Sequence, residues 1–144
     1  MNNIETKKER AVLAGLAAAS MDVHERSSDV TMEELAALVE TAGGETVAAL
    51  IQYRPTPEPR SFLGDGKVRE MKALIEDNDI DLAVFDNELS PSQMRVLEEE
   101  LGVHVLDRSG LILASFLNLN GRFNRLFRLH FLDNQGTMST GIIE

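Results

Sequence analysis

Four short apolar runs alternate with three helical patterns along the chain, and this alternation is the feature that most constrains the fold. The runs are 11–16 (AVLAGL), 46–52 (TVAALIQ), 81–85 (DLAVF) and 103–106 (VHVL). They are nearly continuous in hydrophobicity, which is typical of strands buried on both faces of a parallel sheet. Parallel neighbours need right-handed crossovers, and the intervening helices supply them. The sequence therefore predicts a three-layer α/β domain whose four-stranded parallel sheet has the order 2-1-3-4.

Each helical pattern carries its own start signal. The first begins at Thr31, which forms a predicted capping box with Glu34. The second covers residues 66–77, and Asp65 is its predicted cap. The third, residues 90–101, starts with a serine cap, a proline and a glutamine that closes a second capping box.

Charge is distributed unevenly along the sequence. The chain contains 14 basic and 24 acidic residues, a net charge of −10, which argues against general electrostatic capture of nucleic acid. The stretch from Arg108 to Leu132 nevertheless contains four arginines and no acid. Because arginine donates readily to phosphate, Arg122, Arg125 and Arg128 are candidate RNA contacts.

The absence of cysteine excludes a disulfide framework and a thiolate zinc site. The basic and apolar N-terminus superficially resembles a secretory signal, but acids flank its lysines and its apolar run is near the lower length limit. The run is better interpreted as the first strand. No segment has the length needed to span a membrane, and we expect a cytoplasmic protein.

The stretch FLGDGKV, residues 62–68, raises the question of a phosphate-binding loop. Such a loop requires G-x-x-x-x-G-K-[ST], but Ser61 replaces its first glycine and Val68 its hydroxyl residue. The dinucleotide pattern G-x-G-x-x-G also fails, because Arg69 stands at its third glycine. The residues therefore exclude both nucleotide motifs.

A weaker anion site at the start of this helix is still compatible with the residues. Free helix amides near Gly64 and Gly66, together with Lys67, can hold an anion. The alternative is a glycine turn before a capped helix, in which Asp65 neutralises Lys67. We favour this alternative.

Asp86 and Asp107 follow the third and fourth predicted strands, at the edge where open α/β sheets place ligands. Two such acids could bind magnesium or share acid–base work. Alternatively they mark where buried strands reach solvent, and Asp107 forms a local ion pair with Arg108. The three histidines show no ligand spacing. The residues indicate no catalytic constellation and no metal site.

The last part of the chain permits two interpretations. Asn120-Gly121 is a strong β-hairpin signal. Alternatively, one side of a helix carries apolar residues and another side carries arginines. In this helix, one face carries Phe123, Leu126, Phe127, His130 and Phe131. We favour the helix, and we expect an α/β domain over residues 1–113 followed by a basic, aromatic tail over 114–144.

Three stretches together resemble the N-terminal domain of the HflX-type GTPases: FLGDGKVREMKALI (62–75), VFDNELSPSQMRVLEEELGVHVLDR (84–108) and SGLIL (109–113). The family's G-x-G-K-V turn, F-D-x-E-L-S-P-S-Q segment and D-R-[ST]-G-L-I-L run occur in this order. Residues 31–59 also match the family's preceding helix, strand and proline-containing loop.

The resemblance implies an α/β domain that contributes to binding of the large ribosomal subunit, while GTP hydrolysis belongs to a further domain absent from this chain. An adenine-nucleotide site suggested for some members would give Lys67 a second role. The residues on motif positions are Gly64, Gly66, Lys67, Glu88, Ser90, Gln93, Asp107, Arg108 and Gly110. The resemblance makes none of them catalytic.

After residue 113 the sequence departs from the family pattern, so the chain is either a stand-alone relative or a truncated GTPase. The sequence thus predicts a non-catalytic interaction module that docks on the large ribosomal subunit or its RNA. The alternatives are a domain that binds a nucleotide or other small anion, and a remnant that forms a homodimer through its aromatic tail.

Overall fold

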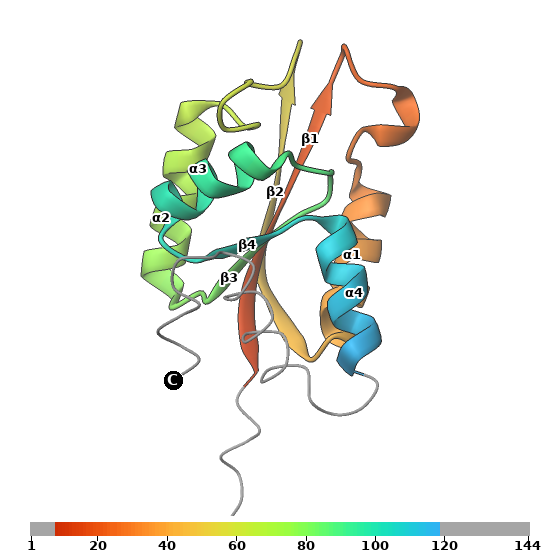
Figure 1. Ribbon diagram of the computed structural model, residues 1–144, viewed down its shortest axis with the longest axis vertical. Coiled ribbons are helices and arrows are strands. Elements are labelled where there is room, and N and C mark those ends of the chain that lie inside the picture. Colours follow the sequence, from red (N-terminus) through yellow and green to blue (C-terminus); the bar gives the residue numbers. More distant parts are fainter. Residues whose placement is uncertain (1–7, 119–144) are drawn as a thin grey trace, which may run out of the picture.

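The computed structural model describes residues 8–118, which form one parallel sheet with helices on both faces (Figure 1). All three strand pairs are parallel and the order is β2-β1-β3-β4, which confirms the predicted topology. The strands are β1 (Glu9–Ala18), β2 (Gly44–Arg54), β3 (Leu82–Phe85) and β4 (His104–Leu106). The two strands that pair most extensively, β1 and β2, extend beyond the predicted apolar runs.

Helices α1 and α4 cover one face of the sheet, and α2 and α3 cover the other (Figure 1). This arrangement confirms the three predicted layers. A short 3₁₀ helix, η2 (Val23–Glu25), follows β1. The other helices are α1 (Asp29–Thr41), α2 (Asp65–Asn78), α3 (Pro91–Leu101) and α4 (Arg108–Asn118).

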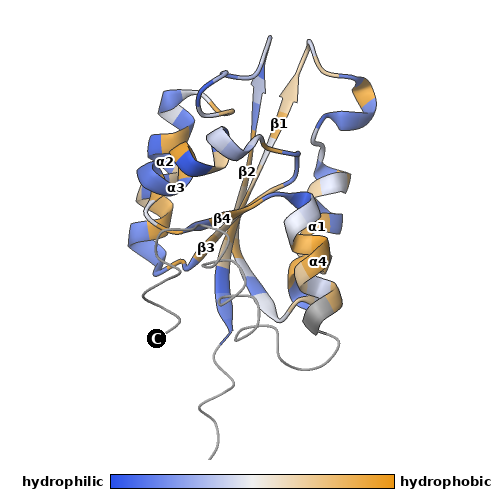
Figure 2. Ribbon diagram, viewed as in Figure 1, coloured by the Kyte–Doolittle hydropathy of each residue, from blue (hydrophilic) through white to orange (hydrophobic). Residues whose placement is uncertain are grey.

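The core consists of two apolar clusters separated by the sheet. Strand β1 contributes to both, because successive side chains point to opposite faces. Leu13 packs toward α1 and α4, whereas Val12 and Leu16 pack toward α2 and α3. Figure 2 shows the hydrophobic residues along β1 in orange. Since burying one such side chain contributes about 1.5–3 kcal/mol, β1 is the centre of the domain's stability.

Two predicted helix starts need correction. Helix α1 is capped by Ser28, whose Oγ accepts from Thr31 N (3.2 Å) while Thr31 Oγ1 accepts from Ser28 N (2.9 Å). Thr31 therefore closes the box and does not open it. In α2 the cap position is Gly64, without a side-chain bond, and Asp65 is the first helical residue. The predicted box of α3, built from Ser90 and Gln93, is confirmed.

Helix α4 begins at Arg108, directly after β4, and was not predicted as a helix at this position. The predicted boundary after residue 113 lies within α4, and the division of the chain there stays a prediction. The predicted hairpin or helix around Asn120-Gly121, and the three tail arginines, lie outside the described residues. Within residues 8–118, no helix combines the length and apolarity that crossing a bilayer requires.

Candidate functional site

The candidate site lies at the carboxyl edge of the sheet, between β1 and β3. The crossover after β1 covers one face of the sheet and the crossover after β2 covers the other, so this edge is the topological switch point where open α/β sheets bind ligands. A pocket of about 420 Å³ opens there. The pocket is lined by residues that follow β1, such as His24, and by Asp86 and Asn87, which follow β3. Phe62 and Arg108 complete this part of the lining.

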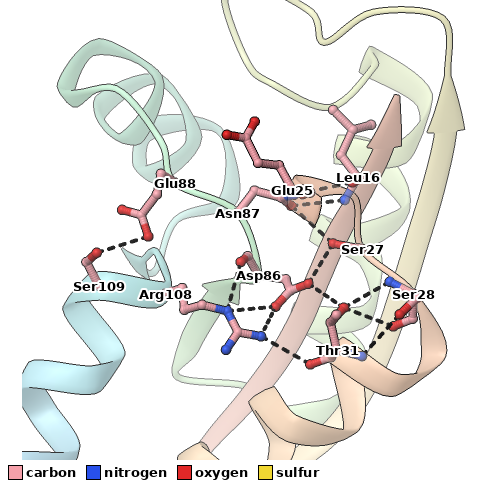
Figure 3. Close-up of polar contacts among 10 residues, drawn as sticks. All are labelled: Leu16, Glu25, Ser27, Ser28, Thr31, Asp86, Asn87, Glu88, Arg108 and Ser109. Carbon is pink, nitrogen blue, oxygen red and sulfur yellow. Dashed lines mark hydrogen bonds and ion pairs between the residues drawn. The ribbon is translucent and has the colours of Figure 1, made fainter. Parts of the chain in front are cut away.

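Asp86 is the centre of the polar contacts at this edge (Figure 3). Its side chain is 5% exposed, and both carboxylate oxygens are occupied. Oδ2 accepts from Ser27 Oγ and Thr31 Oγ1, each at 2.7 Å. Oδ1 forms the ion pair with Arg108, accepting from Nε at 3.1 Å and from Nη2. The carboxylate is therefore neutralised and fully hydrogen-bonded inside the domain.

Arg108 joins three elements through one guanidinium group. Besides the Asp86 carboxylate, its Nε donates to the Asp86 carbonyl (3.2 Å) and its Nη2 donates to the Thr31 carbonyl in α1 (3.2 Å). Because Arg108 is the first residue of α4, these bonds attach the start of that helix to β3 and α1. The predicted pairing of Arg108 with Asp107 is wrong, since the partner is Asp86.

Asn87 fixes the chain that leaves β1. Its Oδ1 accepts from Leu16 N (3.0 Å), and its Nδ2 donates to the carbonyls of Leu16 (3.3 Å) and Glu25 (3.0 Å). Gly15 allows Ser27 to come close, because a Cβ on that glycine would lie 2.4 Å from Ser27 Oγ. The sequence analysis did not identify Asn87, Gly15 or Ser27 as site residues. The Asp86-Asn87 pair after a buried strand was the one available signal.

Asp107 has a separate, local function. Its Oδ1 accepts from Gly110 N (3.0 Å) in the first turn of α4, and its Oδ2 accepts from Leu89 N (3.3 Å). The carboxylate thus satisfies two amides, one of which belongs to the helix start. Nearby, Ser109 Oγ donates to Glu88 (2.9 Å), which adds a further contact between α4 and the segment after β3 (Figure 3).

The glycine turn does not join this site. Gly64, Gly66 and Lys67 belong to the start of α2 and do not line the pocket. Lys67 Nζ pairs with Glu70 at 3.0 Å, so the predicted neutralisation by Asp65 is wrong. A Cβ on Gly66 would meet no atom within 4 Å, so no close approach requires this glycine.

A second pocket, of about 510 Å³, lies at the opposite edge of the sheet and is lined by Glu98 and His104. Glu98 Oε2 accepts from Val105 N at 3.1 Å and lies 4.0 Å from His104 Nδ1. Burial raises the pKa of Glu98, and the bond from Val105 opposes that rise. Residues 8–118 contain no group of three or more potential ligands that could hold a metal ion.

Comparison with solved structures finds the same fold in GTP-binding proteins. The chain matches a GTP-binding protein from the hyperthermophilic archaeon Sulfolobus solfataricus in complex with GDP, with a TM-score of 0.55 and 23% identity over 75% of this chain and 30% of that chain. A second match, the SsGBP and GDP complex, has a TM-score of 0.58 and 22% identity, and covers 92% of this chain and 38% of that one.

Sequence comparisons identify the relatives. The chain is 34% identical over 116 residues to GTPase HflX of Caldanaerobacter subterraneus, covering 81% of this chain and 26% of that protein. It is 43% identical over 86 residues to GTPase HflX of Alkalihalophilus pseudofirmus, covering 60% and 20% respectively. The chain therefore spans about a quarter or less of these curated relatives. Residues 29–116 match the family described as GTP-binding GTPase N-terminal, and this chain belongs to that family.

Proposed function

We propose that this domain is a non-catalytic interaction module that docks on the large ribosomal subunit. One observation carries the proposal: the charged groups at the carboxyl edge satisfy one another. Both oxygens of Asp86 are bonded within the domain, and Arg108 is committed to that carboxylate and to the Thr31 carbonyl. An edge with this geometry holds helices in position. Because the Asp86 carboxylate and the Arg108 guanidinium are engaged in these hydrogen bonds, neither is available for acid–base chemistry.

Membership of the GTP-binding GTPase N-terminal family supports the proposal, because the resemblance described above implies ribosome contact by this domain. The contact would use the acid-free stretch that follows Asp107, where Arg122, Arg125 and Arg128 would meet RNA phosphates. A ribosomal partner also requires a cytoplasmic location.

The experiment is co-sedimentation of the full chain with large ribosomal subunits at about 50 and about 200 mM salt. One variant replaces the three tail arginines with glutamine. The matched control replaces Arg69, Lys72 and Arg95, which are exposed on α2 and α3, and therefore changes the net charge equally. We expect salt-sensitive binding by the wild type and the control, and loss of binding by the tail variant. Absence of wild-type binding at both salt concentrations would overturn the proposal.

A second candidate function, nucleotide or small-anion binding, is favoured by the pocket at the switch point. Calorimetric titration with an adenine nucleotide tests it. Saturable binding that is lost in His24→Ala but kept in Lys67→Ala would assign the ligand to the pocket. The reverse result would assign it to the start of α2, and no heat of binding in the wild type would dismiss this function for that ligand.

A further inference from the structure

Strand β2 is one edge of the sheet, and its outer side is open. It has 11 residues and pairs only with β1, whereas β4, at the other edge, has 3 residues. Within residues 8–118, no backbone hydrogen bond joins the outer side of β2 to another segment. Such an edge presents a row of amides and carbonyls that can pair with a further strand.

The pairing with β1 shows which backbone groups of β2 point outward. The Arg54 carbonyl accepts from Ala19 N at 3.0 Å, so Arg54 directs its backbone groups toward β1. The pairing is regular over this part of the strand, and backbone groups alternate in direction along it. The amides and carbonyls of Ala49, Ile51 and Tyr53 therefore point away from β1. These three residues are available to a further strand.

The sequence of β2 gives this edge little protection against pairing. Residues 48–53, which follow the register shift between β1 and β2, read AALIQY and contain no charge and no proline. Natural edge strands are commonly protected by lysine, by proline or by short length. In β2 the charged residues stand near the two ends, Glu45 at the start and Arg54 at the finish. The stretch between them is suited to strand addition.

We propose that β2 pairs antiparallel with β2 of a second copy of this chain, which joins the two sheets into one. The charged ends determine the direction, because a parallel pair would align Glu45 with Glu45 and Arg54 with Arg54. A twofold axis at Ile51 uses all three outward-pointing residues, since Ala49 then faces Tyr53 of the other copy. Tyr53 is 73% exposed and Ala49 is exposed, so a large ring meets a small side chain on the same face of the joined sheet.

Helix α1 gives this dimer a characteristic salt dependence. The twofold axis is perpendicular to the sheet, so α1 of both copies lies on the same face. This helix contains no lysine or arginine, and Asp29, Glu33 and Glu40 are exposed at spacings of four and seven residues, on one side. Glu40 and Thr46 line one pocket, so this side of α1 is adjacent to β2. Like charges therefore oppose the dimer, and added salt should strengthen it by screening them.

Sedimentation velocity of the full chain over a wide range of protein concentration tests the proposal. The test variant is Ala49→Pro, which removes an outward amide and leaves the bonds to β1 in place. The matched control is Ala49→Ser, which keeps the amide and a small side chain. We expect Ala49→Pro to raise the dissociation constant of the dimer at least about tenfold, because the twofold axis removes two bonds at once. The control should keep the wild-type value.

Disulfide formation gives a second measurement, which decides the matter if circular dichroism shows that Ala49→Pro does not fold. The native chain lacks cysteine. Ile51→Cys places two thiols at the axis, where facing Cα atoms about 5.5 Å apart permit a disulfide. The control, Ser92→Cys, places an exposed thiol on α3, which packs against β4 near the other edge. We expect disulfides between chains to form at least about tenfold faster at position 51.

The possible results separate this dimer from other forms of association. A wild-type chain that stays monomeric at every concentration would overturn the proposal. A dimer that a folded Ala49→Pro variant leaves intact, or equal disulfide rates at the two positions, would also overturn it and would assign self-association to another surface. Weakening of the dimer by salt would contradict the placement of both α1 helices on one face. None of these results bears on ribosome docking, which is measured separately and is expected to weaken with salt.

Discussion

Replacing Asp86 with alanine should destabilise the domain more than any exposed charge substitution. The change removes the acceptor for three side chains that come from different parts of the chain. Ser27 and Thr31 lose bonds of 2.7 Å, and the Arg108 guanidinium loses its counter-ion while only 26% of its side chain is exposed. The two hydroxyls and the cation thus lose their charged acceptor, and the hydroxyls keep only the neutral acceptors Asn87 Oδ1 (3.3 Å, for Ser27) and the Ser28 carbonyl (3.1 Å, for Thr31).

The magnitude follows from the burial of the pair. Removing one partner of a buried ion pair costs about 3–5 kcal/mol, because the remaining charge is uncompensated. Arg108 is partly exposed and keeps its bonds to the carbonyls of Asp86 and Thr31, which reduces this cost. The two hydroxyls add to it, since a hydrogen bond to a charged group contributes about 1.5–3 kcal/mol. We expect a net loss of about 3–4 kcal/mol in the free energy of unfolding.

Urea unfolding, monitored by far-UV circular dichroism, measures this loss of stability. Circular dichroism is suitable because the chain contains no tryptophan for a fluorescence assay. A double-mutant cycle with Arg108→Met isolates the pairwise term. The matched control is Glu76→Ala, which breaks the exposed pair with Lys72 and should cost less than about 0.5 kcal/mol. A loss below about 1 kcal/mol for Asp86→Ala, with no coupling to Arg108, would refute the reasoning.

Three further predictions use the same urea assay. Gly15→Ala should cost about 1–3 kcal/mol, because the new Cβ would lie 2.6 Å from Ser27 Cβ, and an unchanged midpoint would contradict this packing. Ser90→Ala should cost about 1 kcal/mol through loss of the bond from Gln93 N (3.1 Å), whereas Ser92→Ala should cost less. Glu98→Gln should gain stability relative to wild type as the pH rises from about 4 to 7, because a raised folded-state pKa makes the wild type lose stability over that window. A constant difference across this pH range would show that Glu98 ionises normally.

The sheet could be predicted from the sequence because its determinants are local. Each buried strand is a continuous apolar run, and each crossover has its own amphipathic pattern, so topology follows from the order of the elements and the handedness rule. The cap of α3 was predictable for the same reason, since Ser90 and Gln93 are three residues apart. The start of α1 was misplaced because several adjacent residues are good caps, and the local pattern does not distinguish Ser28 from Thr31.

The polar contacts at the carboxyl edge could not be predicted, because they depend on tertiary proximity. Asp86 meets Ser27 across 59 positions and Thr31 across 55, and no periodicity links residues so far apart. Its pairing with Arg108 was missed because Asp107 is the adjacent acid, yet Asp107 is occupied by the amides of Gly110 and Leu89. Position along the chain suggested one partner for Arg108, and the geometry of the sheet edge selects another.

The pairing of Arg108 with Asp86, and not with the adjacent Asp107, has a consequence for the whole domain. A pair between adjacent residues would stabilise only one turn, whereas the observed pair connects the segment after β3 to the first residue of α4 and, through the Thr31 carbonyl, to α1. Since the first turn of a helix determines its axis, these bonds determine the direction of α4 on the sheet domain. The charges at this edge, which resemble those of a ligand site, thus hold the helix that follows β4 in its direction.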